Sequence, residues 1–141
     1  MKKFLLLNIA LFLCFMAQGQ SPIGIWENID DEDGKPKSHI EIYEQDGKLY
    51  GKVNKLLPGA TLNQCKNCKG SRKNQPLEGM VILWDLENQG DHYDNGTILD
   101  PKTGKEYGCK MSMDSADILD VRGYLKLSIF GRTQQWFRVK M

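Results

Sequence analysis

Three of the four cysteines, Cys65, Cys68 and Cys109, are the most reactive side chains beyond the first twenty residues. The Cys-x-x-Cys spacing of the first two occurs in redox pairs, structural disulfides and metal sites. Redox pairs usually precede a helix that lowers the thiol pKa, and no helical pattern follows here. We therefore expect a disulfide between Cys65 and Cys68, with a bridge from either of them to Cys109 as the alternative.

Metal binding is the second chemistry that these side chains suggest. A site built on three cysteines needs a fourth ligand, which His39 or His92 would have to supply. The acidic run at 30–33 lacks the glutamate that closes a calcium loop, so we interpret it as a solvated hairpin tip. We predict no metal ion and no other cofactor.

Arginine and aromatic side chains along the chain suggest a pocket for an anionic or aromatic ligand. The alternative is that Arg122 and Arg132 point outward, to solvent or to acidic neighbours on adjacent strands. The candidate ligand-binding residues are Tyr43, Tyr50, Trp84, Arg122, Tyr124 and Arg132.

The sequence contains few features of an enzyme. Beyond residue 20 its histidines are His39 and His92, and it has no Gly-x-Ser-x-Gly, His-Glu-x-x-His or phosphate-loop motif. Asp100 stands in a Pro-Gly turn and is interpreted as a turn residue. We predict no catalytic residue, and a thiol-active enzyme that uses Cys65 is the weakest functional hypothesis.

Strands must position these residues, because apolar and polar residues alternate along much of the chain. From Leu119 to Ile129 every second residue is apolar or glycine, a period that predicts a half-buried strand. Further strands are predicted at 23–29, 38–44, 49–54, 79–86, 96–99, 107–113 and 133–139. This spacing favours an all-β fold, an antiparallel barrel or sandwich of about eight strands.

The interior and one long loop follow from the same pattern. The segment from Pro58 to Pro76 is irregular and contains the Cys65-x-x-Cys68 motif, and a loop of this length is usually functional or covalently tied down. Residues 87–95 are polar and are predicted to form a turn. The predicted interior residues are Ile40, Ile42, Leu49, Val53, Val121, Leu125 and Leu127.

Residues 1–19 have the pattern of a cleaved signal peptide. Lys2 and Lys3 precede an apolar run that is short for a membrane span, and Ala17-Gln18-Gly19 fits a cleavage site. Without those two lysines, the 19 basic residues fall to 17 against 18 acidic ones, and no basic stripe marks a nucleic-acid surface. We expect an exported protein, periplasmic or extracellular, in which residues 20–141 form one domain without a transmembrane segment.

The two ends of the mature chain resemble the closure of lipocalin barrels. Gly24-x-Trp26 stands in the first predicted strand, and Trp136 and Arg138 stand in the last. In lipocalins, a first-strand Trp packs across the barrel base and a last-strand Arg covers it. The resemblance implies an up-and-down barrel that is closed by these four residues.

The mature chain as a whole resembles the DUF 2147 family of exported bacterial proteins, a domain of unknown function. The motifs that carry the resemblance follow one another through most of the chain: Gly47-Lys48-Leu49-Tyr50-Gly51, Cys65-x-x-Cys68, Gly96-Thr97-Ile98-Leu99-Asp100-Pro101, Arg122-Gly123-Tyr124 and Phe130-Gly131-Arg132-Thr133-Gln134. The resemblance implies a lipocalin-like barrel and brings no activity with it.

Two functional hypotheses stand ahead of the enzyme. The first is an exported binding protein that holds a small apolar or amphipathic ligand inside the barrel. The alternative is an envelope protein with a solidly packed barrel, whose loop at 58–76 and acidic hairpin meet a protein partner. An eight-stranded barrel is either filled by its own side chains or holds one small ligand, so its interior volume separates the two.

Overall fold

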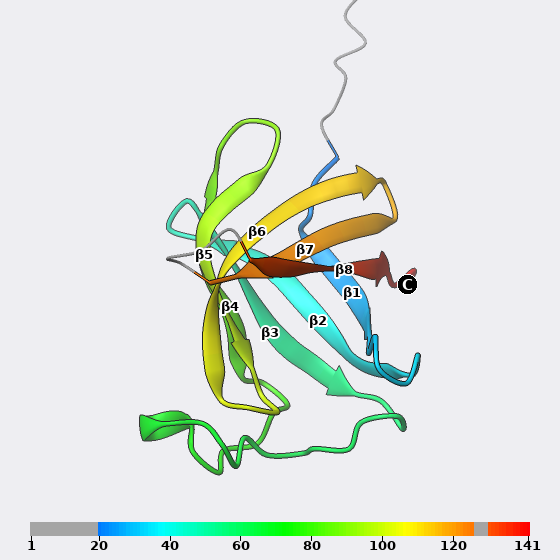
Figure 1. Ribbon diagram of the computed structural model, residues 1–141. Helices are drawn as coiled ribbons and strands as arrows, with labels where there is room; N and C mark the ends of the chain where they lie inside the picture. Colours follow the sequence, from blue (N-terminus) through cyan, green and yellow to red (C-terminus); the bar gives the residue numbers. More distant parts are fainter. Residues whose placement is uncertain (1–19, 126–129) are drawn as a thin grey trace, which may run out of the picture.

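Eight antiparallel strands close into a barrel in the computed structural model, which describes residues 20–125 and 130–141 (Figure 1). Each strand pairs with the next along the chain, and the last pairs with the first. The strands are β1 (Gly24–Ile29), β2 (Pro36–Gln45), β3 (Lys48–Leu56), β4 (Val81–Asn88), β5 (Tyr93–Asp100), β6 (Lys105–Ser115), β7 (Ile118–Tyr124) and β8 (Gly131–Arg138). The predicted all-β, up-and-down barrel is confirmed.

The barrel closes between β1 and β8. Trp26 is the Cα partner of Arg138, and Asn28 is the Cα partner of Trp136. Closure removes the unpaired edges that an open sheet would expose. The predicted signal peptide, residues 1–19, lies outside the described residues. Within the part that the structure describes, no helix is long and apolar enough to cross a membrane.

The predicted turn at 87–95 is shorter in the structure: residues 89–92 form it, and the residues on either side lengthen two strands. The pairs Glu87↔Asp94 and Asn88↔Tyr93 continue the ladder between β4 and β5. This hairpin extends beyond the rest of the barrel (Figure 1), and its residues are exposed or half-buried. Polar side chains therefore fit a strand here, and polar composition alone did not predict where the turn begins and ends.

The strand predicted from Leu119 to Ile129 already ends before Leu125, and its residues 126–129 lie outside the described residues. It ends at Tyr124 as β7, where the ladder with β8 also ends at Gly131. Leu125, predicted in the interior, is 51% exposed, and Leu127 lies outside the described residues. The alternating pattern reports which face a side chain would take, but it does not report where strand pairing stops.

The other five predicted interior residues are in the core: Ile40, Ile42, Leu49, Val53 and Val121 are buried. Gly51 lies among them on β3, and a Cβ at this position would stand 2.9 Å from Leu83 Cδ1. The register between β3 and β4 shifts on both sides of Gly51. This glycine therefore allows the two strands to approach closely where the sheet bends.

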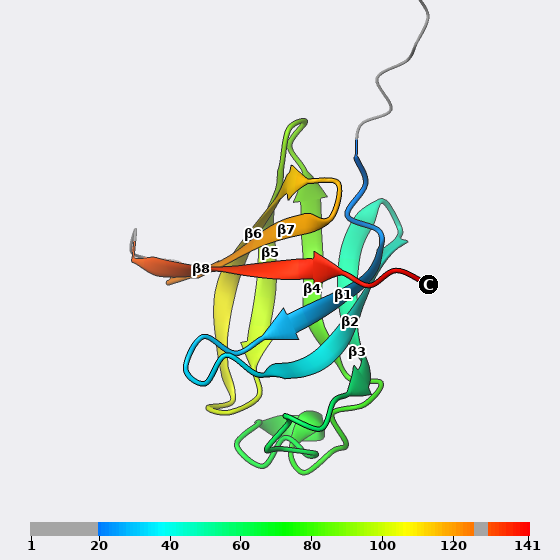
Figure 2. The ribbon, with the colours of Figure 1, turned by 90° about the vertical axis from the view of Figure 1, so that its right-hand side faces the viewer.

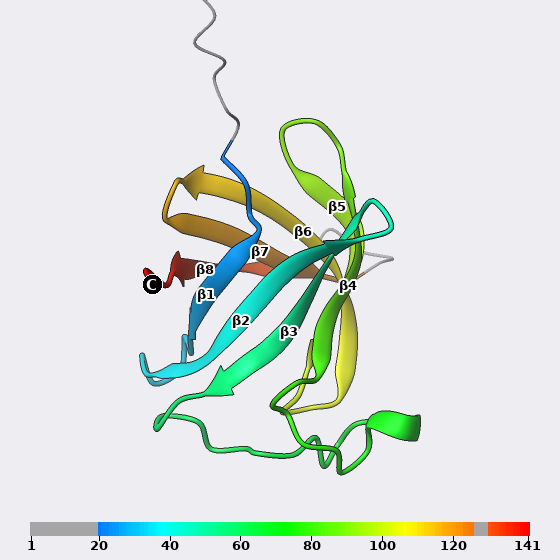
Figure 3. The same ribbon diagram turned by 180° about the vertical axis from the view of Figure 1, so that it is seen from behind.

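The two ends of the barrel differ. At the end where β1 begins and β8 ends, the packed end, large side chains such as Trp26, Leu86 and Leu119 are fully buried. At the opposite end, the open end, the long segment between β3 and β4 includes the short 3-10 helix η1 (Gly70–Arg72). This segment runs beneath the turn that joins β5 and β6 (Figures 2 and 3).

Candidate ligand-binding site

A cavity of about 670 Å³ opens at the open end of the barrel. Ligand pockets in proteins usually span roughly 300–1,000 Å³, so one small organic molecule fits this volume. Most of the wall is apolar and includes Ile40, Val53, Leu62, Leu77, Ile82, Ile98, Val121 and Trp136. The barrel is therefore not filled by its own side chains at this end.

On two strands, inward side chains become smaller toward the open end, which leaves space for the cavity. On β2, Ser38 takes the inward position that Ile42 takes nearer the packed end. On β7, Gly123 takes the inward position toward the open end, and Leu119 takes the one toward the packed end. Side chains two residues apart share one face of a strand, so a change in their size along the strand changes how far the interior is filled.

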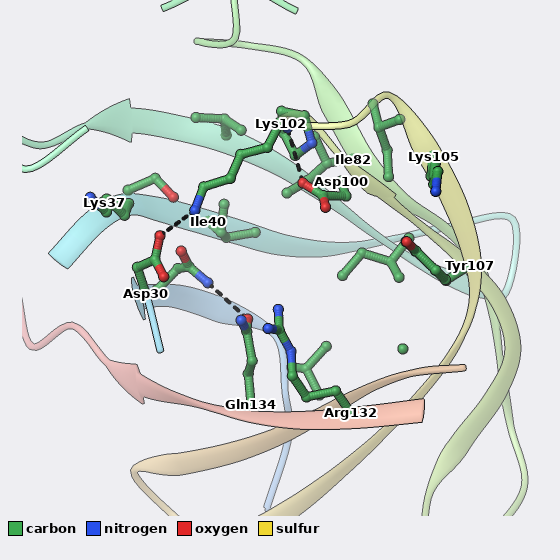
Figure 4. Close-up of a pocket in the computed structure, with 18 of the residues that line it drawn as sticks. Asp30, Lys37, Ile40, Ile82, Asp100, Lys102, Lys105, Tyr107, Arg132 and Gln134 are labelled. Atoms are coloured by element: carbon green, nitrogen blue, oxygen red, sulfur yellow. Dashed lines mark hydrogen bonds and ion pairs between the residues drawn. The ribbon is translucent and has the colours of Figure 1, made fainter. Parts of the chain in front are cut away.

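One ion pair spans the mouth of the cavity. Lys102 in the β5–β6 turn places Nζ 2.6 Å from Asp30 Oδ2 and 3.5 Å from Glu32 Oε2, both on the β1–β2 hairpin (Figure 4). The hydrogen bond with Lys102 lowers the pKa of Asp30, and the same bond raises the pKa of Lys102. The Asp30 side chain is 11% exposed, so it is not the solvated hairpin residue that we had expected.

The cysteine-containing loop holds the β5–β6 turn in place. Asn67 Nδ2 donates a hydrogen bond to the carbonyl oxygen of Lys102 at 2.6 Å. Gly104 has a φ of 72° and lies so close to the backbone of Asn67 that a Cβ would overlap it. Leu62 and Leu77, which flank the disulfide in sequence, reach the cavity wall. The loop is therefore part of the site.

Gln134 forms a polar part of the cavity wall. Its Oε1 accepts hydrogen bonds from Asn28 Nδ2 at 3.3 Å and from Trp136 Nε1 at 3.5 Å. Its Nε2 donates to Asp31 Oδ2 at 3.3 Å. Both ends of this carboxamide are engaged with the protein, so Gln134 ties β8 to β1 and to the acidic hairpin.

Tyr43 and Tyr50, two of the predicted ligand-binding residues, do not line the cavity. Their rings stack on the outer face of β2 and β3, with centroids 5.8 Å apart. The hydroxyl of Tyr50 donates to Asp85 Oδ1 at 3.1 Å, and this hydrogen bond raises the pKa of Tyr50. Tyr43 directly follows the inward-facing Ile42, and Tyr50 directly follows the inward-facing Leu49. Because successive side chains in a strand point to opposite faces, both tyrosines point outward.

Trp84 and Arg122 also lie away from the cavity. The guanidinium of Arg72 covers the Trp84 ring at 4.5 Å from its centroid. Arg122 Nη1 donates to Thr133 Oγ1 at 3.5 Å between β7 and β8. The outward orientation weighed for Arg122 in the sequence is the one that the structure has.

Tyr124 and Arg132 border the cavity. The Tyr124 ring packs over Gly108, and its hydroxyl donates to Asp94 Oδ1 at 2.8 Å. Burial and this hydrogen bond raise the pKa of Tyr124 to about 12. Asp94 does not line the cavity, so the Tyr124 hydroxyl is engaged outside it. Arg132 stands at the rim, 67% exposed, with Nε 3.6 Å from Asp31 Oδ2.

At the packed end, Arg138 covers Trp26, with Cζ 4.4 Å from the centroid of the indole. Gly24 leaves room for it, because a Cβ there would lie 2.7 Å from Arg138 Nη1. Trp136, also buried, lies across from Asn28 in the β1–β8 ladder. The guanidinium of Arg138 donates to three backbone carbonyl oxygens: those of Ser21 (2.7 Å), Ile23 (3.2 Å) and Ala116 (2.9 Å).

Cys65 and Cys68 form a disulfide, with Cα atoms 5.3 Å apart, and Cys109 is a buried free thiol. The predicted pairing is confirmed, and the alternative bridge to Cys109 is wrong. Burial raises the pKa of Cys109 to about 12. Across residues 20–125 and 130–141, no group of three or more His, Cys, Asp or Glu side chains is arranged to hold a metal ion.

Sequence reasoning missed Lys102, Lys105 and Tyr107 as cavity residues. A signal for Tyr107 was present, because it alternates in phase with Cys109 and Met111, which are buried. Lys105 falls on the same face, two residues earlier. Lys102 has no comparable signal, since its partner on the β1–β2 hairpin is 72 residues away in sequence.

The family model of uncharacterised proteins conserved in bacteria, DUF2147, matches residues 24–138. The chain belongs to the DUF2147 family. The match begins with the first residue of β1 and ends with the last residue of β8, so it covers the whole DUF2147 barrel. No curated protein sequence matches the chain.

A solved structure, protein HP1028 from the human pathogen Helicobacter pylori, resembles this DUF2147 barrel with a TM-score of 0.75. The two chains are 25% identical, and the match covers 85% of this chain and 84% of that one. HP1028 is described as belonging to the lipocalin family. The predicted lipocalin-like fold is confirmed.

Proposed function

We propose that this DUF2147 protein is an exported binding protein that holds one small apolar or amphipathic molecule in the open half of its barrel. The observation that carries the proposal is the cavity of about 670 Å³, with its apolar wall and charged rim. Moving apolar ligand surface from water to such a wall is favourable by roughly 25 cal/mol per Å². The rim offers charged groups to a polar end of the ligand.

Export to the periplasm or to the outside of the cell is part of the proposal. Residues 1–19 have the composition of a signal peptide. The Cys65–Cys68 disulfide supports an oxidising compartment, because disulfides rarely persist in the bacterial cytoplasm.

The alternative, an envelope interaction module with a solid barrel, has weaker support. Its interior would be filled, whereas the open half of this barrel is hollow. The loop that was to meet a partner is engaged with its own chain, through the hydrogen bond from Asn67 to Lys102 and the close approach of Gly104.

Fluorescence titration with N-phenyl-1-naphthylamine, a neutral apolar dye, tests the proposal. We expect saturable binding of one dye per protein. Gly123→Leu puts an apolar side chain into the cavity and should weaken dye binding by about tenfold or more. Lys110→Leu is the matched control, since it adds the same side chain at an exposed position of β6 and should bind as the wild type does.

Circular dichroism establishes that both variants are folded before their affinities are compared. Dye binding that never saturates, together with native mass spectra of the gently purified protein in which no small molecule is retained, would contradict the proposal. Equal dye affinity for both leucine variants would place the dye outside the cavity.

A further inference from the structure

Gly123 is a glycine that neither the backbone nor the packing requires. Its φ lies outside the left-handed region, and a Cβ there would meet Ile98 Cγ2 at 3.6 Å and Tyr107 Cβ at 3.8 Å, which are ordinary contacts. By contrast, a Cβ at Gly51 would lie only 2.9 Å from Leu83 Cδ1. A Cβ at Gly96 would lie only 2.5 Å from Leu86 Cγ. The missing side chain at Gly123 therefore has a different consequence, which is an empty space in the cavity wall.

Two polar side chains border this space, which we call the Gly123 hollow, and a third lies nearer the rim. Arg132 on β8 is the Cα partner of Gly123. Tyr107 on β6 stands on the other side, and Figure 4 shows its side chain directed from β6 into the cavity. Lys105 follows on the same face of β6, two residues nearer the rim.

These three side chains have donors to spare. Within the described residues, neither the hydroxyl of Tyr107 nor the ammonium of Lys105 has a hydrogen-bond or ion-pair partner. Arg132 contacts Asp31 through Nε at 3.6 Å, and its two terminal nitrogens have no partner in that same part of the chain. A guanidinium, an ammonium and a phenol together form a donor set for a small oxyanion.

The other cationic side chains at the rim are already paired. Lys37 Nζ lies 2.6 Å from Asp33 Oδ2, and Lys102 Nζ is paired with Asp30 Oδ2 across the mouth of the cavity. Asp100, the Cα partner of Lys105 on the neighbouring strand, accepts hydrogen bonds from the backbone and a hydroxyl of its own turn. Of the cationic side chains at the rim, Lys105 and Arg132 are therefore the ones with the weakest neutralisation by acidic neighbours.

We propose that the cavity selects an anionic amphiphile, whose carboxylate sits over Gly123 among Tyr107, Lys105 and Arg132. Its chain extends along the apolar wall toward Val121 and Trp136. This inference rests on the proposed function, and it adds the charge of the ligand and the place where that charge is bound.

Displacement of N-phenyl-1-naphthylamine by three amphiphiles with the same twelve-carbon chain tests the inference. The probes are dodecanoate, dodecanol and dodecyltrimethylammonium. We expect dodecanoate to displace the dye at a concentration about tenfold lower than dodecanol does, since charge-assisted hydrogen bonds add to the same apolar contacts. The cationic probe should be the weakest.

Variants locate the headgroup. Arg132→Gln and Tyr107→Phe should each reduce the preference for dodecanoate over dodecanol by about threefold to tenfold, with the affinity for dodecanol unchanged. Arg122→Gln is the matched control, because it removes one arginine charge from the outer face of the neighbouring strand and should leave the preference intact.

Equal displacement by dodecanoate and dodecanol, or strongest displacement by the cationic probe, would overturn the inference while the proposed function stands. A preference for dodecanoate that survives both Arg132→Gln and Tyr107→Phe would overturn the assigned location. Failure of the dye itself to bind removes the proposed function, and the inference with it.

Discussion

Arg138 shows how much one side chain contributes to closing the barrel at the packed end. It stacks on the Trp26 indole and donates to three carbonyl oxygens, two in the segment before β1 and one in the β6–β7 turn. A guanidinium can do both because it is flat and carries five donors in fixed directions, whereas an ammonium is a compact point charge.

Replacing Arg138 with lysine should therefore destabilise the barrel although the charge is kept. We expect Arg138→Lys to lower the free energy of unfolding by about 1–3 kcal/mol in urea denaturation, since charged hydrogen bonds and the stacking contact are lost together. Arg132→Lys, at an exposed rim position, is the control and should change stability little. A fully stable Arg138→Lys protein would mean that charge alone closes this end.

Cys109 should be inert in the folded protein. Burial raises the pKa of its thiol to about 12, and the thiolate is the reactive form. We expect iodoacetamide to leave Cys109 unmodified near pH 8 in the native protein and to label it after unfolding, as located by peptide mass spectrometry. Rapid labelling without unfolding would contradict the buried position of this side chain.

Among the elements, the β5–β6 turn links the most features of the site. The cysteine-containing loop supports it from one side through Asn67, and Lys102 extends from it across the mouth to Asp30. Loop, turn and hairpin are thus connected in one chain of contacts, and each link has its own test.

The Lys102–Asp30 pair should be visible in an acid titration. Because the folded pKa of Asp30 is below its ordinary value of 3.8, its stabilisation is present above pH 3.8 and is lost as the pH falls through the folded pKa. We expect Lys102→Gln to raise the pKa of Asp30 toward 3.8 in carbon NMR of the side-chain carboxyl, with Lys105→Gln as the control. An unchanged value would mean that the backbone N–H of Glu32, which also donates to Asp30, sets the pKa.

The disulfide should stabilise its loop locally. A bridge that closes so short a segment contributes about 2 kcal/mol in the chain-entropy model. In the double variant Cys65→Ser/Cys68→Ser, we expect hydrogen exchange of the Asn74 and Leu77 amides, which bond within the loop, to rise by up to about 30-fold. The Arg138 amide at the packed end should keep its protection, and equal acceleration there would indicate global destabilisation instead.

At the scale of the whole molecule, the barrel separates stability from binding. Large side chains that fill the interior, and Arg138 over Trp26, lie at the packed end, and the cavity lies at the open end. Perturbations of distant, unconnected sites usually add rather than couple. The two ends should therefore respond independently to mutation.

A thermal shift measurement checks this independence. Dye at a hundred times its dissociation constant should stabilise the folded protein by about 2.7 kcal/mol and raise the melting temperature by several degrees. Arg138→Lys should start from a lower melting temperature and show the same increase, because the cavity is intact. A much smaller increase in Arg138→Lys would reveal coupling between the two ends.

Sequence and structure agree most closely where local patterns decide. Alternation along β2, β3 and β7 correctly predicted Ile40, Ile42 and Val121 in the core, and the short spacing of Cys65 and Cys68 led to the correct disulfide. The same alternation, applied to residues 43, 50 and 122, would have turned those side chains outward. The ligand-binding prediction chose these residues for their chemical type and did not consider which face of the strand they occupy.

The sequence by itself determined the number and approximate place of the strands, most of their inward faces, the closing pair of Trp26 and Arg138 as a resemblance, and the disulfide. Each of these follows from neighbours in the chain or from a motif. Only the tertiary structure decided which half of the barrel is hollow, because that depends on the summed volume of side chains from eight strands. It also decided that Lys102 reaches Asp30 and that Tyr107 and Arg132 border Gly123, because barrel closure brings together residues that lie far apart in the chain.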